Sequence, residues 1–204
     1  MLYIENYYKM IKKVINHKDD IDTIIIYLDN VLNDKEIFDY LEKMTDFEGA
    51  EKYTPRLQKW YQSDQHYFSK LWKKKYKRWI SKDYDKYLLE LQKKIEDITN
   101  TYIDTYVKFN SCLINKYRDG TDIIKPHRDA IESFGEYPII SNISLGAPRT
   151  IRFDSEFSES FELVLKSGSL LIMAGSSQKY FKHSIPVSDN NDIRYSLTFR
   201  EFIG

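Results

Sequence analysis

Apolar residues are spaced differently in the two halves of the chain. Over residues 83–102 they recur every three or four positions, which predicts an amphipathic helix. The same spacing predicts a helix over residues 2–16, and a capping-box pair at the start of residues 34–44 predicts a third. Residues 21–32 are rich in β-branched side chains, and we expect part of this segment to be extended. The first half is therefore predicted to be mainly helical.

From residue 106 onward, apolar and polar residues alternate, which is the pattern of half-buried strands. Short strands are predicted over residues 111–117, 139–145, 150–153, 161–165, 169–173, 181–186 and 193–202. Short strands separated by turns predict a closed or double-sheet β architecture. Helices from the first half would brace one of the sheets, so the predicted fold class is α+β.

Composition and charge exclude several classes of protein. The 204 residues include 31 basic and 31 acidic side chains, so nucleic-acid binding would have to rest on local patches rather than net charge. Cys112 is the only cysteine, which excludes a disulfide within the chain and a cysteine zinc site. We find no signal peptide and no apolar run of membrane-spanning length. We therefore expect an intracellular monomer with no membrane partner.

His127 and Asp129 are candidates for a metal site. On a strand, residues two apart point to the same face, which would place this imidazole beside this carboxylate. These groups are two of the three ligands in the 2-His-1-carboxylate triad of non-haem Fe(II). Among the four histidines, His183 is the best candidate for the third ligand, because it follows a run typical of a buried strand. The alternatives are a zinc or structural site, or satisfied polar residues of the core.

The segment from Arg194 to Arg200 alternates strictly between apolar and polar residues. Its polar face carries both arginines together with Ser196 and Thr198. A buried charge is costly without a partner, so two arginines on one face of a half-buried strand indicate an anion. Arginine binds carboxylates through paired, charge-assisted hydrogen bonds, and two such residues suit the two ends of a small dicarboxylate. Beside an Fe(II) triad, this predicts a 2-oxoglutarate-dependent oxygenase.

The second half of the chain resembles the AlkB-like Fe(II)/2-oxoglutarate-dependent dioxygenases, which remove alkyl groups from nucleic-acid bases by oxidation. The resemblance runs from about Phe109 to Phe202, and its motifs follow the family's order and spacing. The motifs are Phe109-Asn110, residues 113–120, His127-Arg128-Asp129, residues 143–147, residues 168–173, His183-Ser184-Ile185-Pro186 and residues 194–200.

The resemblance implies a cofactor, two cosubstrates and a set of residues that bind them. The cofactor is Fe(II), and the cosubstrates are 2-oxoglutarate and O2. Asn115 and Tyr117 would hydrogen-bond the carboxylates of 2-oxoglutarate. Arg194 would bind its distal carboxylate, and Arg200 would lie near the carboxylate next to the metal. Ser196 stands where many relatives have asparagine, and it keeps the capacity to hydrogen-bond.

The resemblance also implies a fold and a division of the chain. The family fold is a double-stranded β-helix of the jelly-roll type, with N-terminal helices packed on one sheet. We expect residues 1–50 to form a helical extension and residues 51–204 to form the dioxygenase domain. Within that domain, residues 51–105 would provide a substrate lid and a support helix, and residues 106–204 the jelly-roll core.

Residues 52–64 are similar to the segment that covers the substrate pocket in base-demethylating relatives. Arg56 suits contacts to phosphate, and Gln58 belongs to the same short motif. Tyr61 or Trp60 could stack on a flipped base. The alternative interpretation is an ordinary polar loop.

A dense basic run interleaved with aromatic residues covers residues 71–79. Its cations suit a nucleic-acid backbone and are Lys73, Lys74, Lys75, Lys77 and Arg78. The aromatic residues of the run share one helical face, so the alternative is a helix with buried aromatics and a solvated basic surface.

The chain departs from its nucleic-acid-repairing relatives at Ile131. Those relatives usually have an acidic residue two positions after the aspartate ligand, where it reads the exocyclic amine of the damaged base. Isoleucine can neither accept a hydrogen bond nor offset a positive charge. Glu132 is adjacent and is the rival candidate for this role.

The function that this sequence predicts is oxidative dealkylation of N-alkylated bases in DNA or RNA. One alternative is the same oxygenase chemistry on another substrate, such as protein. The other is a non-catalytic nucleic-acid-binding module that retains the fold. The intact ligand set favours an enzyme, and the lid-like segment and basic run favour a nucleic-acid substrate.

Overall fold

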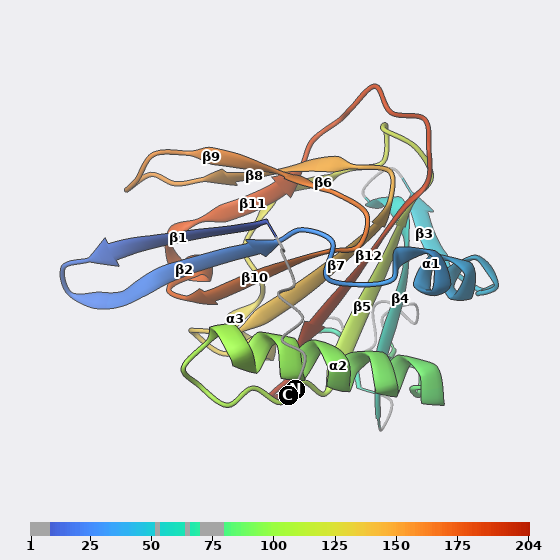
Figure 1. The fold of residues 1–204 in the computed structure, drawn as a ribbon, viewed down its shortest axis with the longest axis horizontal. Coiled ribbons are helices and arrows are strands. Elements are labelled where there is room, and N and C mark those ends of the chain that lie inside the picture. The colour runs from blue at the N-terminus through green and yellow to red at the C-terminus, as the bar shows by residue number, and fades with distance from the viewer. Residues whose placement is uncertain (1–8, 52–53, 64–65, 70–79) are drawn as a thin grey trace, which may run out of the picture.

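The computed structural model describes residues 9–51, 54–63, 66–69 and 80–204, and it contains two β-sheets that face each other (Figure 1). The large sheet has eight strands in the order β1-β2-β10-β7-β12-β5-β4-β3, and the small sheet has four in the order β6-β11-β8-β9. The strands of the large sheet are β1 (Met10–His17), β2 (Asp20–Leu28), β10 (Ser169–Gly175), β7 (Ile140–Gly146), β12 (Arg194–Arg200), β5 (Ser111–Tyr117), β4 (Thr54–Gln62) and β3 (Glu48–Glu51). The small sheet contains β6 (Ile124–His127), β11 (Lys182–Ile185), β8 (Arg149–Asp154) and β9 (Phe161–Leu165).

This arrangement is the double-sheet architecture that the strand pattern predicted, and it agrees with the α+β jelly-roll fold that the resemblance implied. Neighbouring strands in both sheets pair antiparallel, and strands that follow one another in the chain often lie in different sheets. Residues pointing inward from the two sheets form an apolar cluster between them, to which β8 and β10 contribute Ile151, Phe153 and Leu171. The cavity that holds the candidate site opens between the same two sheets.

Two longer helices lie on the outer face of the large sheet (Figure 1). They are α1 (Asp34–Glu42) and α2 (Lys86–Tyr102). The N-terminus of α2 is capped by Asp85, whose side chain accepts a hydrogen bond from the backbone of Leu88. The buried stripe of α2, which includes Leu88, Leu91 and Ile95, packs on the apolar residues of the strands. The helices therefore close one side of the sheet and leave its other face to the cavity.

The predicted helix over residues 2–16 is wrong where the structure describes it. Residues 10–17 form β1, which pairs with β2, and β2 pairs with the central strand β10. Isoleucine and valine favour strands, and pairing with an existing sheet edge overrides a helical spacing in so short a segment. Within the described part of residues 1–50, helix is thus confined to α1, and the expected helical extension is in large part an extension of the sheet. The division of the chain at residue 51 stays a prediction.

Where it is described, the segment over residues 52–64 is not a loop, and its role as a substrate lid stays a prediction. It contains β4, which pairs along its length with β5 in the large sheet. The structure also has two four-residue helices, α3 (Ile131–Phe134) and α4 (Ser177–Tyr180), which the sequence pattern did not predict. No helix in the described ranges is both long and apolar enough to cross a membrane.

Candidate metal centre and adjoining cavity

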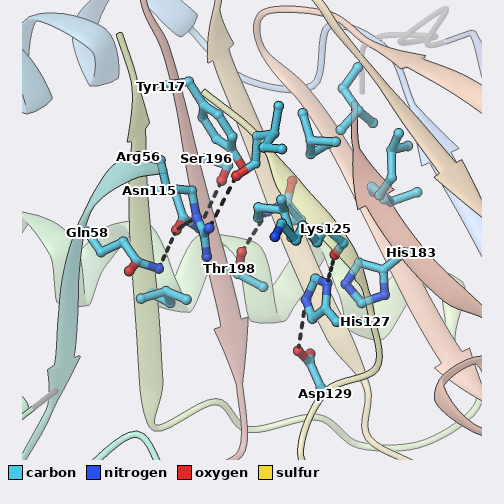
Figure 2. Close-up of a pocket in the computed structure, with 18 of the residues that line it drawn as sticks. Arg56, Gln58, Asn115, Tyr117, Lys125, His127, Asp129, His183, Ser196 and Thr198 are labelled. Carbon is cyan, nitrogen blue, oxygen red and sulfur yellow. Dashed lines mark hydrogen bonds and ion pairs between the residues drawn. The ribbon is translucent and has the colours of Figure 1, made fainter. Parts of the chain in front are cut away.

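The three predicted metal ligands lie together at one end of the small sheet. His127 ends β6 and is the direct cross-strand partner of His183 on β11, and their ring centroids are 4.3 Å apart. Asp129 follows β6 in a loop, and its Oδ1 lies 3.9 Å from Nε2 of His127. One donor atom from each residue lies within 4.8 Å of the others, which is close enough for one metal ion. Figure 2 shows the three side chains at the wall of the cavity.

The orientation of Asp129 comes from contacts with distant residues, because the strand ends before it. Its backbone N–H donates to Oε1 of Gln178 at 3.0 Å, and Gln178 lies on α4. Arg200, on β12, donates to the carboxylate through Nε at 2.8 Å and Nη2 at 3.3 Å. The spacing of residues on a strand predicts that Asp129 lies beside His127. The side-by-side placement holds, but Arg200 and Gln178 maintain it rather than the strand.

The electrostatic environment keeps all three groups in the form that binds a metal. Burial, and then the charge of the neighbouring His127, lowers the pKa of His183 to about 3, and burial also lowers the pKa of His127. Both imidazoles are therefore neutral at pH 7. Burial alone would raise the pKa of Asp129, but the charges around it, chiefly that of Arg200, hold the pKa below its usual value. The carboxylate is therefore ionised.

The hydrogen bonds of the histidines fit a metal as well. Nδ1 of His127 lies 3.0 Å from the backbone oxygen of Lys125, so this nitrogen carries the proton and Nε2 is left as the donor atom toward Asp129. Nδ1 of His183 is buried and has no hydrogen-bond partner among the described residues. Two neutral imidazoles and one ionised carboxylate, with one orphaned ring nitrogen, fit a non-haem Fe(II) centre.

A cavity of about 450 Å³ extends from the triad between the two sheets. Its polar wall is built by direct cross-strand pairing: Asn115 on β5 pairs with Ser196 on β12, and Tyr117 pairs with Arg194 on the same strands. Because side chains on a strand alternate, these four residues share the inner face of the large sheet. All four predicted cosubstrate residues named here therefore line the cavity.

Arg194 is the clearest sign of an anion site. It is 1% exposed, and its guanidinium carbon lies 4.8 Å from the ring centroid of Tyr117. One nitrogen, Nη2, donates to Oγ of Ser144 at 2.8 Å, whereas Nε and Nη1 have no partner among the described residues. Burial lowers the pKa of Arg194, yet a guanidinium stays charged in proteins. A buried cation with two free donors fits a carboxylate such as the distal one of 2-oxoglutarate.

Two of the residues predicted from the lid-like segment reach the same wall. Gln58 is the cross-strand partner of Asn115, and its Nε2 donates to Oδ1 of Asn115 at 3.0 Å. Arg56 donates to the same oxygen through Nε at 2.8 Å and to the backbone oxygen of Ile123 through Nη1 at 3.3 Å. Figure 2 shows both side chains pointing from β4 toward Asn115. The amide oxygen of Asn115 is thus occupied, and its Nδ2, 3.4 Å from Oγ of Ser196, faces the cavity wall.

The structure does not bring Tyr61 into the cavity. Residues 56 and 58 point inward from β4, so residue 61 points outward, and Tyr61 belongs to the cluster that packs under α2. Its hydroxyl lies 3.8 Å from the sulfur of Met44, and burial raises the pKa of Tyr61 to about 12. The neighbouring Trp60 is 1% exposed within a separate aromatic cluster. Neither ring is open to stack on a base.

Ile131 and Glu132 do not line the cavity either. Both are exposed at the start of α3, two and three residues after Asp129. The helical turn directs them to the surface, so neither is placed to contact a base in the cavity. The basic run with Lys73, Lys74, Lys75, Lys77 and Arg78 lies outside the described residues.

Two residues of the site were not predicted from the sequence. Gln178 contacts a residue 49 positions away, and Ser144 contacts Arg194 from a distance of 50 positions. The Ser144 contact depends on sheet register, and the Gln178 contact depends on a helix of four residues. Neither feature produces a recognisable pattern in the local sequence. The alternation of residues 140–146 could have placed Ser144 on the inward face, because Ser144 is the cross-strand partner of Ser196.

Comparison with known proteins gives consistent matches. A family model described as "2OG-Fe(II) oxygenase superfamily" matches residues 24–200. The chain is 31% identical over 157 residues to "Alpha-ketoglutarate-dependent dioxygenase alkB homolog 3" of Mus musculus, which covers 72% of this chain and 51% of that protein. It is 30% identical over 118 residues to "DNA oxidative demethylase ALKBH2" of Arabidopsis thaliana, which covers 46% of this chain and 38% of that protein.

A solved structure agrees on the fold. "The structure of OsALKBH1" has a TM-score of 0.60 and 13% sequence identity, over 93% of this chain and all of that one. At this identity the likeness concerns the fold alone. The chain spans about half the length of the mouse relative that it matches.

Proposed function

This chain belongs to the 2OG-Fe(II) oxygenase superfamily, and we propose that it removes alkyl groups from nitrogen atoms of nucleobases in DNA or RNA. One observation carries the proposal. A triad that fits Fe(II) and a buried arginine with two free donors line the same cavity. The names of the relatives, which include a DNA oxidative demethylase, support a nucleic-acid substrate.

His127, Asp129 and His183 would hold the metal. Fe(II) with 2-oxoglutarate and O2 supplies an oxidation that hydroxylates the N-alkyl carbon and leaves succinate and CO2. Arg200 keeps Asp129 ionised, and Gln178 fixes the backbone from which its carboxylate projects. The two neutral imidazoles require no proton to leave when the metal binds.

The wall formed by β5 and β12 would hold 2-oxoglutarate. Arg194 offers Nε and Nη1 to the distal carboxylate, and the aromatic face of Tyr117 keeps the guanidinium in place. Asn115 has its oxygen bound by Arg56 and Gln58, so its amide presents N–H donors rather than an acceptor. Nη1 of Arg200 is buried and without a partner among the described residues, and it would meet the carboxylate next to the metal.

The remainder of the cavity would take the alkylated base. A base must leave its stack to reach the metal, and the cavity is large enough for one. Apolar side chains also line the cavity, Ile151 from the small sheet and Leu171 and Met173 from β10 of the large sheet, and they would exclude water. The hydroxylated alkyl group then leaves as an aldehyde, and the ring nitrogen regains its ordinary state.

Mass spectrometry of oligonucleotides provides the test. Single- and double-stranded DNA and RNA with one methylated base each are incubated with the protein, Fe(II) and 2-oxoglutarate. At least one substrate should lose the mass of one CH2 group for each methyl group removed. The Asp129→Ala and His183→Ala variants should leave every oligonucleotide unchanged. Decarboxylation of 2-oxoglutarate that restores no base in the whole panel would contradict the proposal.

A further inference from the structure

The cavity carries an excess of positive charge. Among the described residues that line it, five are cationic and one is acidic. The cations are Arg56, Lys125, Arg128, Arg194 and Arg200, and the acid is Asp129. Lys125 and Arg128 are exposed at the rim, where solvent screens them, but Arg194 and Arg200 are buried and Arg56 is partly buried. The inner part of the cavity thus has three guanidinium groups facing one carboxylate.

Two of these three guanidinium groups have anions assigned to them. Arg200 is bound to Asp129, and Arg194 would bind the distal carboxylate of 2-oxoglutarate under the proposed function. Arg56 is different. Its two hydrogen bonds go to neutral oxygens, those of Asn115 and the backbone of Ile123. The acid whose charge acts on it, Asp122, is paired with Arg118 instead. The charge of Arg56 is therefore not compensated by a direct partner.

Binding of Fe(II) and 2-oxoglutarate would not remove this excess of positive charge. The two positive charges of Fe(II) equal the two negative charges of 2-oxoglutarate, so their sum is zero. The acid that could offset a cationic base in relatives is replaced by Ile131, and the adjacent Glu132 lies at the surface outside the cavity. A third ligand entering the cavity therefore meets net positive charge in a region of low dielectric, where charges interact strongly.

We propose that this cavity selects alkylated bases that are neutral, with a carbonyl oxygen beside the alkylated ring nitrogen, over bases that alkylation makes cationic. The inference rests on the proposed function and narrows its substrate class. Methylation at N1 of adenine or N3 of cytosine produces a cation, which Arg56 and the other guanidinium groups repel. Methylation at N3 of thymine or uracil, or at N1 of guanine, leaves a neutral ring. A carbonyl oxygen beside the alkylated nitrogen of such a ring can accept a hydrogen bond from an arginine.

An internal competition tests this selection. Two oligonucleotides of the same length and sequence context, one with 3-methylthymine and one with 3-methylcytosine, are mixed in equal amounts in one reaction. Mass spectrometry follows the loss of both methyl groups. Because both substrates share the same enzyme, metal and 2-oxoglutarate, any general loss of activity in a variant cancels in the ratio of the two rates. The wild-type ratio should favour the neutral base.

Three variants assign the selection to Arg56. Arg56→Gln removes the charge and should shift the ratio toward the cationic base by about tenfold or more, which corresponds to about 1.4 kcal/mol. Arg56→Lys keeps the charge and should keep the wild-type preference. Arg152→Gln is the matched control, because Arg152 is an exposed arginine on β8 that pairs with Asp154 outside the cavity. It should leave the ratio unchanged.

The outcomes separate this inference from the proposed function. Faster removal from the cationic base by the wild type would overturn the charge selection and leave base dealkylation standing. An unchanged ratio in Arg56→Gln would remove Arg56 as the selecting group and overturn the inference as stated. Loss of methyl from neither oligonucleotide, nor from any other member of the methylated panel, would overturn the proposed function itself.

Discussion

Arg200 holds Asp129 from the far side of the cavity, with its Nε 2.8 Å from Oδ2 and its Nη2 3.3 Å from Oδ1. The two residues are 71 positions apart, and both are almost fully buried. The pair joins the large sheet to the loop that follows β6. Both side-chain hydrogen bonds that Arg200 makes among the described residues go to this candidate metal ligand, and its Nη1 is left for the cosubstrate carboxylate that we expected it to lie near.

The Arg200→Met variant should lower the free energy of unfolding of the metal-free protein by about 3–5 kcal/mol, because removing one partner leaves a buried charge uncompensated. Added Mn(II) should restore part of this loss, since the metal replaces arginine as the cation beside Asp129. Urea unfolding with and without Mn(II) measures both effects. A change below about 1 kcal/mol would mean that the pair behaves like an exposed one.

The Arg194→Gln variant should raise the KM for 2-oxoglutarate by about tenfold or more and leave metal affinity unchanged. Charge-assisted hydrogen bonds contribute about 1.5–3 kcal/mol each, and Arg194 has two free donors for the distal carboxylate. Steady-state decarboxylation gives the KM, and calorimetric titration with Mn(II) gives the affinity. An unchanged KM would place the carboxylate elsewhere in the cavity.

The Gln178→Leu variant should weaken metal binding by about 10- to 100-fold, the usual effect of losing a group that orients a ligand. Its side chain accepts the backbone N–H of Asp129, and leucine cannot replace this acceptor. Titration with Mn(II) measures the change. Gln62→Leu is the control, because Gln62 is also a buried glutamine but lies outside the cavity lining. Equal losses in both variants would indicate a general effect on folding.

The Tyr61→Phe variant should leave oligonucleotide binding and turnover unchanged, because the ring packs under α2 and not in the cavity. Stability should change by less than about 1 kcal/mol, since the only contact of the hydroxyl within the described residues is a long one to a sulfur atom. Fluorescence anisotropy with a labelled oligonucleotide tests the first expectation. A tenfold loss of affinity for the oligonucleotide would indicate that Tyr61 belongs to the substrate site.

The strands of the second half could be predicted because one face of each is buried and the other is polar. The segments with the clearest alternation, such as residues 161–165 and 194–200, agree with the observed strands within a few residues. Helix α2 could be predicted because its apolar stripe continues for more than four turns. The clustering of His127, Asp129 and His183 could be predicted because so few histidines are available and the surrounding motifs are specific.

The remaining features depend on register between distant segments. β1 is an edge strand whose conformation is decided by pairing with β2, and its own spacing also suited a helix. β4 lies beside β5 with Gln58 opposite Asn115, and this register decides that Arg56 points inward while Tyr61 points outward. The exposure of Ile131 follows from a helix of four residues. Local patterns carry no information on such relationships, so side chains were assigned to the correct segments but in part to the wrong faces.

The coupling between decarboxylation of 2-oxoglutarate and demethylation of the base tests the central claim most directly. One sample contains the protein, Fe(II), 2-oxoglutarate and a methylated oligonucleotide, and succinate, formaldehyde and restored base are quantified together. The account predicts equal amounts of the three products, and little succinate when an unmethylated oligonucleotide of the same sequence is used. Succinate formation at the same rate with both oligonucleotides, without formaldehyde or restored base, would contradict it.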